Sequence, residues 1–270
     1  MKTFQGDKFP YPMVNRPKID SEDKVKLRIE KTFDDLDNYL DIVHSYIYTE
    51  INLLYDDGDE RINISRIQHI VSSVLLRSIY LRNGIVDAIN SRNIVCIFTN
   101  LKSFMEVPAV FAFLHSKIES RMTEENLLNT LNQVAMGNRG NPDWRIGKIK
   151  SINTLTMFKY LDRYIKKSDG KNANKELDFI MENFYGDICN VAHPNYDAHD
   201  VVGFFDHKKN QWKGFEPSII KERMITEFDW YSPSLNMTIA LISSLCDSIV
   251  NDSKINNFEK LSSPNYFYIE

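Results

Sequence analysis

Residues 21–54, SEDKVKLRIEKTFDDLDNYLDIVHSYIYTEINLL, place an apolar side chain at every third or fourth position. The recurring residues are Val25, Ile29, Phe33, Leu36, Leu40, Val43, Ile47, Ile51 and Leu54. This spacing matches the 3.6-residue turn of an α-helix that buries one face. Ser21 is a favourable N-cap, and the run Asp56-Asp57-Gly58 is typical of a helix end. The stretch therefore predicts a helix of about 35 residues.

The same periodicity recurs along most of the chain. It predicts further helices from about 59 to 84 or beyond, from 91 through 114, and over about 123–137, 151–167, 174–193, 217–229 and 233–260. Ser91 is expected to cap the third helix, and Pro108 to kink it. Ten glycines and nine prolines are few for 270 residues, which argues against a chain of tight turns. We predict an all-α fold, a multi-helix bundle with long antiparallel helices.

Two short segments interrupt the helical pattern. Val201-Val-Gly-Phe-Phe205 and Gln211-Trp-Lys-Gly-Phe215 flank His207-Lys-Lys-Asn210, which predicts a small β-hairpin within 200–216. Residues 1–19 hold three prolines among aromatic side chains and are expected to form an extended N-terminal arm. The remainder, 20–270, is predicted to be a single helical domain that contains the hairpin.

Composition narrows the classes of function. The formal net charge of −4 argues against nonspecific duplex binding driven by total charge, although a local basic patch stays open. No uninterrupted apolar stretch reaches about 18 residues, and the first residues lack a signal-peptide pattern. We therefore expect a soluble cytoplasmic protein with no membrane segment.

The chain contains no sequence motif for binding a metal ion or a cofactor. The three cysteines are widely spaced in apolar surroundings, so they indicate neither a disulfide framework nor a C-x-x-C site. His193, His199 and His207 have no H-E-x-x-H pattern or repeated carboxylates beside them. We expect no metal and no cofactor.

The run Tyr185-Gly-Asp-Ile-Cys-Asn190-Val-Ala-His193-Pro194 carries the most distinctive polar groups. Tyr185, Cys189 and His193 stand at i, i+4 and i+8, on one face of a helix. Pro194 disfavours helix at the preceding residue, which places His193 at the C-terminal end. Because a helix C-terminus stabilises a protonated imidazole, His193 is a candidate general acid or phosphate contact.

A second polar pair stands on the third predicted helix. Lys102 and Glu106 are four residues apart between apolar neighbours, so the pair is a candidate for a partly buried face. The candidate partners of this pair are Tyr185, Asn190 and His193 on the later helix and Arg77 on the second helix. An ordinary surface ion pair is an equally good interpretation.

The segment 137–147 is rich in glycine and breaks all periodicity. It presents Arg139, Trp144 and Arg145, which are suited to gripping a phosphate or stacking on a base. The segment matches neither a P-loop nor a dinucleotide fingerprint. A long connection between helices is the favoured interpretation.

Together, Asn100-Leu-Lys102-Ser-Phe-Met-Glu106 and Tyr185-Gly-Asp-Ile-Cys-Asn-Val-Ala-His193-Pro194 resemble elements of uncharacterised bacterial all-α families. Those families carry (R/K)-x-x-x-E and Y-x-x-(L/I)-(S/C)-x-x-x-H-P and are similar to the HEPN superfamily. The resemblance covers about residues 60–200. It implies a helical bundle, a homodimer, and a context of phage defence or toxin–antitoxin systems, in which many members are metal-independent ribonucleases.

The chain departs from the HEPN catalytic element, R-x4-6-H. Counting back from His193, the positions that should hold arginine are Ile188, Asp187 and Gly186. Either a distant arginine such as Arg77, Arg92 or Arg145 supplies the positive charge, or nuclease chemistry has been lost. Lysine at 102 is a point charge and lacks the bidentate geometry of a guanidinium.

Two hypotheses follow. The favoured one is a noncatalytic HEPN-like interaction or ligand-sensing protein, with a protein partner, whose polar residues form a satisfied network. The alternative is a HEPN-like ribonuclease or nucleotide-binding effector that binds RNA or a nucleotide. In it, His193 transfers protons, Tyr185 and Asn190 position phosphate, and Lys102 with Glu106 organises the pocket.

Overall fold

The computed structural model describes residues 23–44, 46–47, 62–120, 122–136, 152–168, 180–192, 203–214 and 217–250. The predicted N-terminal arm at 1–19 and the glycine-rich segment 137–147 lie outside these residues. The described helices are α1 (Asp23–His44), α2 (Ile62–Asn90), α3 (Ile94–Glu119), α4 (Glu124–Met136), α5 (Thr154–Ser168), α6 (Ile180–Ala192) and α8 (Pro217–Val250). The predicted all-α fold is confirmed.

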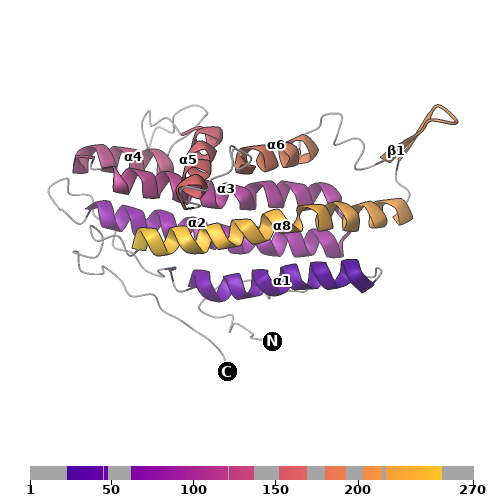
Figure 1. Ribbon diagram of the computed structural model, residues 1–270, viewed down its shortest axis with the longest axis horizontal. Helices are drawn as coiled ribbons and strands as arrows, with labels where there is room; N and C mark the ends of the chain where they lie inside the picture. The colour runs from indigo at the N-terminus through magenta and orange to yellow at the C-terminus, as the bar shows by residue number, and fades with distance from the viewer. Residues whose placement is uncertain are drawn as a thin grey trace, which may run out of the picture.

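The helix α3 forms the centre of the bundle (Figure 1). It packs against α2, α4, α5, α6 and α8. Its buried residues surround most of its circumference, and Leu101, Phe104, Met105 and Phe111 are fully buried. A helix that is apolar on nearly all sides is stable only when other helices cover it. The other described helices each contribute side chains to the hydrophobic core around α3.

Pairs of contacts along each helix show the helix directions. Asp37 pairs with Arg82 and Tyr39 with Ser78, so α1 and α2 run antiparallel. Gly84 lies beside Asn100 and Arg77 beside Glu106, so α2 and α3 run antiparallel as well. The helix α8 instead runs parallel to α1, because Arg28 bonds Asp229 near one end and Tyr46 bonds Asp247 near the other. Short loops favour antiparallel neighbours, whereas α8 returns to α1 only after α4, α5, α6 and the hairpin have intervened.

The end of the first helix differs from the prediction. The first helix ends at His44, although Ile47 beyond it is still 3% exposed. The Tyr46 N–H bonds the Val43 carbonyl in a tight terminal turn, so apolar spacing continues where the helix does not. The predicted positions 48–54 lie outside the described residues.

The helix predicted to reach Gly84 or beyond is α2, which passes Gly84 and continues to Asn90. A Cβ at Gly84 would lie 2.9 Å from the Asn100 side-chain oxygen, so glycine permits the close approach of α2 and α3. The cap of α3 is Asn93, not the predicted Ser91. The Asn93 side chain accepts a hydrogen bond from the Cys96 N–H at 3.1 Å, while the Ser91 hydroxyl donates back to the Asp87 carbonyl of α2.

The two helices predicted over 217–229 and 233–260 are one helix, α8. Pro233 lacks the N–H that would bond the Asp229 carbonyl in a regular helix. The Ser232 hydroxyl donates to that carbonyl at 2.9 Å. The Ser232 hydroxyl thus satisfies the carbonyl that Pro233 leaves without a backbone donor, and the helix continues through this position. Pro108 likewise lies inside the continuous α3.

The predicted β-hairpin is confirmed. Strands β1 (Gly203–Asp206) and β2 (Gln211–Gly214) pair antiparallel, with Asp206 opposite Gln211. Asn210 in the connecting turn has φ 49°, a left-handed conformation that asparagine tolerates.

Two described stretches, Ile94–Glu119 and Ile225–Val250, are long and apolar enough to cross a membrane. The core helix of a soluble protein passes the same test, and 56% of the tested window in the first stretch is buried. In this structure both stretches pack against other helices of the bundle.

A buried ion pair fixes α1 against α2. The Arg82 side chain is fully buried and lies 2.5 Å from Asp37. Its guanidinium also donates to the Asn83 side chain at 3.0 Å and lies over the Phe33 ring. A guanidinium removed from water requires such partners, because an unpaired buried charge is costly.

We predict that Asp37→Asn lowers the free energy of unfolding by about 3–5 kcal/mol, because it removes the negative charge that pairs with the buried Arg82 guanidinium. Urea denaturation measures this loss. Glu30→Gln is the matched control, since it breaks the exposed Lys26–Glu30 pair on the same helix. That control should cost less than about 1 kcal/mol. Equal losses in the two variants would contradict the assignment.

Candidate functional site

The helix α6 is held in place by a carboxylate of α5. Asp162 is buried and accepts hydrogen bonds from the backbone N–H groups of Met181 at 3.0 Å and Glu182 at 3.3 Å. These groups lie in the first turn of α6, where backbone donors have no partner within the helix. A carboxylate is also favourable at the positive end of the helix dipole. The side chain thereby orients α6, including Tyr185 one turn further on.

Tyr185 belongs to α6 and contacts both α5 and α3. It is 6% exposed, and its ring packs against Phe158 with centroids 4.3 Å apart. Its hydroxyl donates to Glu106 Oε1 at 2.8 Å. Burial raises the pKa of the Tyr185 phenol, and the charge and hydrogen bond of Glu106 raise it further. The phenol therefore stays protonated and acts as a hydrogen-bond donor.

Two cations flank this hydrogen bond. Arg77 Nη2 of α2 lies 4.0 Å from Glu106 Oε2, and Lys102 Nζ lies 5.9 Å from the centroid of the Tyr185 ring. The Arg77 side chain is 61% exposed, whereas that of Glu106 is 22% exposed. The cluster thus runs from a buried phenol to an exposed guanidinium. Four residues predicted for the site, Arg77, Lys102, Glu106 and Tyr185, meet in the structure.

Cys189 belongs to the same face of α6. Burial raises the pKa of its half-buried thiol, the hydrogen bond with Tyr185 and the charge of Lys102 lower that pKa, and the charge of Glu106 raises it. The i, i+4 spacing from Tyr185 already placed this thiol on the Tyr185 face, although no motif assigned it a role. A thiol with a raised pKa is a weak nucleophile at neutral pH.

The remaining predicted site residues are not part of this cluster. Asn190 is exposed and lies about 140° around α6 from Tyr185 at 100° per residue, so the two do not share a face. The predicted pairing of Tyr185 with Asn190 on one phosphate is therefore not supported by the helix geometry. His193, Arg139 and Arg145 lie outside the described residues.

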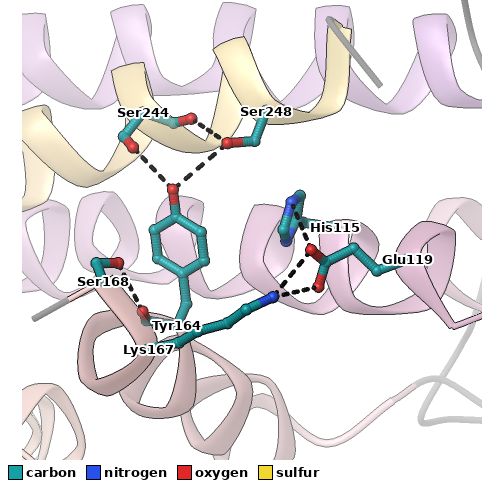
Figure 2. Close-up of polar contacts among 7 residues, drawn as sticks. All are labelled: His115, Glu119, Tyr164, Lys167, Ser168, Ser244 and Ser248. Carbon is teal, nitrogen blue, oxygen red and sulfur yellow. Dashed lines mark hydrogen bonds and ion pairs between the residues drawn. The ribbon is translucent and has the colours of Figure 1, made fainter. Parts of the chain in front are cut away.

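A second polar cluster joins α3, α5 and α8 (Figure 2). Glu119 lies between Lys167, at 3.0 Å, and His115, at 3.8 Å. The Tyr164 hydroxyl reaches α8, 2.7 Å from the Ser244 hydroxyl. This cluster was not predicted from the sequence, since its local signal was the i, i+4 spacing of His115 and Glu119 alone. Exposed pairs such as Lys167–Glu119 contribute little energy, so the cluster mainly sets how α5 lies on its neighbours.

Among the described residues, no group of three or more histidine, cysteine, aspartate or glutamate side chains is arranged to hold a metal ion. Comparison with known proteins finds no match among protein-family models, curated proteins or solved structures. The chemistry of the site therefore rests on its own geometry.

Alkylation of Cys189 provides a test of the electrostatics at this site. Glu106→Gln removes a negative charge that raises the thiol pKa, so iodoacetamide should label Cys189 about 2- to 10-fold faster at pH 8. Lys102→Gln should slow the same reaction, since it removes a charge that lowers the pKa. Peptide mass spectrometry measures the labelling, with exposed Cys96 as internal reference and Glu30→Gln as control. Changes of the same sign in the two site variants would contradict the arrangement.

Proposed function

We propose that the chain is a noncatalytic HEPN-like helical protein that senses a ligand or binds a protein partner. The context that fits the resemblance is a cytoplasmic homodimer in bacterial phage defence or a toxin–antitoxin system. The observation that carries the proposal is the hydrogen bond from Tyr185 to Glu106 within the cluster of charges. At the junction of α2, α3 and α6, the polar and charged side chains interact with one another.

The protonation states favour binding over catalysis. The Tyr185 phenol is committed to Glu106 as a donor, and the raised pKa of Cys189 keeps its thiol protonated at neutral pH. Arg77 stands next to the Glu106 carboxylate, which offsets part of the positive charge, and Lys102 lies over the Tyr185 ring. The positions of the HEPN motif arginine hold Ile188, Asp187 and Gly186. This set of groups suits a network that fixes helix register.

The alternative is a metal-independent ribonuclease or a nucleotide-binding effector that uses His193. Its support is the presence of Arg77 beside Glu106 and of Lys102 over the ring of Tyr185, a residue of α6, the helix that leads to His193. Two cations in one cluster can stabilise phosphate charge without the motif arginine. The two functions differ in turnover, which gives a direct test.

We expect the wild-type chain and His193→Ala to cleave a fluorogenic RNA oligonucleotide at the same background rate in EDTA. General acid–base catalysis contributes about 10²- to 10⁴-fold, so a catalytic histidine would show a loss of at least that order. The measurement is single-turnover cleavage with enzyme in excess, and circular dichroism confirms that the variant is folded. A loss of 100-fold or more in His193→Ala would establish the ribonuclease and reject the noncatalytic proposal.

We expect Tyr185→Phe to lower the free energy of unfolding by about 1–3 kcal/mol, because it leaves the partly buried Glu106 carboxylate without its donor. Glu106→Gln keeps a hydrogen-bond acceptor and should cost less. A double-mutant cycle between the two positions, measured by urea denaturation, isolates their coupling. Tyr160→Phe on α5 is the control for loss of a phenol hydroxyl. A coupling energy near zero would show that the hydrogen bond does not hold the network together.

A further inference from the structure

The hairpin formed by β1 and β2 stands apart from the bundle. Figure 1 shows it projecting past the helix ends, and its extensive contacts among the described elements are between its own two strands. Residues 207–212 are all exposed. Two short strands gain little stability by themselves, so a projecting hairpin with exposed side chains is suited to contacting another molecule.

The hairpin has the opposite charge to the whole chain. Between Gly203 and Gly214 the sequence holds three lysines and one aspartate, a formal charge of +2 in a chain whose net charge is −4. The aspartate is used to build the turn. Asp206 Oδ1 accepts hydrogen bonds from the backbone N–H groups of Lys208 at 3.1 Å and Lys209 at 3.2 Å. This arrangement holds the backbone of both lysines at the exposed turn.

An exposed tryptophan lies beside these lysines. Trp212 is 55% exposed and follows the turn on β2. A Cβ atom at Gly214 would collide with its indole ring, so the ring lies over Gly214. Glycine thus leaves room for the indole to lie along the strand, with half of its surface facing solvent. A large aromatic surface held in this way is a platform for stacking.

The hairpin therefore combines an aromatic platform with cations on a projecting turn. We propose that the hairpin Gly203–Gly214 binds single-stranded nucleic acid, with Trp212 stacked on a base and Lys208, Lys209 and Lys213 against the phosphates. An unpaired strand is favoured over a duplex because its bases are free to stack on a protein ring. Lys213 also pairs with Asp206 at 3.5 Å, so its ammonium is held on the hairpin. This inference does not depend on the cluster around Tyr185.

The test is fluorescence anisotropy with labelled single strands of uridine or thymidine, 12 nucleotides long, and with a labelled duplex. Trp212→Ala should weaken single-strand binding by about 10-fold or more, and Trp212→Phe should restore much of it. Lys208→Ala should reduce the slope of log affinity against log salt by about 0.7 if one phosphate contact is lost. Trp230→Ala is the matched control, since Trp230 is 75% exposed on α8. Lys166→Ala on α5 controls for the loss of an exposed lysine.

The outcomes separate the possibilities. Preference for uridine strands identifies RNA as the ligand, and equal affinity for both strands supports single-stranded nucleic acid in general. Tighter binding to the duplex would overturn the single-strand assignment. The proposal also fails if the wild-type chain binds no strand in 50 mM salt, or if Trp230→Ala weakens binding as much as Trp212→Ala. Unchanged melting temperatures show that the variants remain folded.

Discussion

The burial of α3 is the constraint on which the rest of the structure depends. Leu101, Phe104, Met105 and Phe111 are fully buried, and each such side chain contributes about 1.5–3 kcal/mol when it leaves water. Phe113 and Leu114 are buried as well, and with Leu101 they lie about 100–140° apart around the helix, so α3 needs cover on nearly all sides. The helices α2, α5, α6 and α8 supply that cover, and α1 packs outside them against α2 and α8.

The candidate site lies where this cover is incomplete. Lys102 and Glu106 occupy the half-buried side of α3, next to α6. The side chain of Asp162 sets the start of α6, and the hydroxyl of Tyr185 joins it to Glu106. The polar groups are close together because three helices meet there, and they satisfy one another because partial burial makes unpaired groups costly.

The hairpin is a different kind of surface. In the cluster around Glu106 a carboxylate offsets part of the positive charge, whereas the hairpin concentrates lysines and an exposed indole on a projecting turn. A chain with a net charge of −4 has no overall attraction for polyanions, so a local basic element determines where one would approach. The two surfaces can be altered separately, since their residues belong to different elements, α2, α3 and α6 in one case and β1 and β2 in the other.

Sequence by itself determined the all-α class, the hairpin and most helix positions, because periodicity and turn residues are local signals. It also brought forward Arg77, Lys102, Glu106 and Tyr185 as partners, since i, i+4 spacing identifies a helix face. Only the tertiary structure decided which faces meet. Asp37 pairs with Arg82 across 45 positions, and Glu119 pairs with Lys167 across 48. The cap that Asp162 provides for α6 and the parallel direction of α8 likewise depend on how the helices pack. Ser232 at Pro233 and the early end of α1 show the same limit at helix boundaries, where hydrogen bonds outside the regular helical pattern override periodicity. Such contacts carry no period along the chain, so they become visible only when the helices are packed.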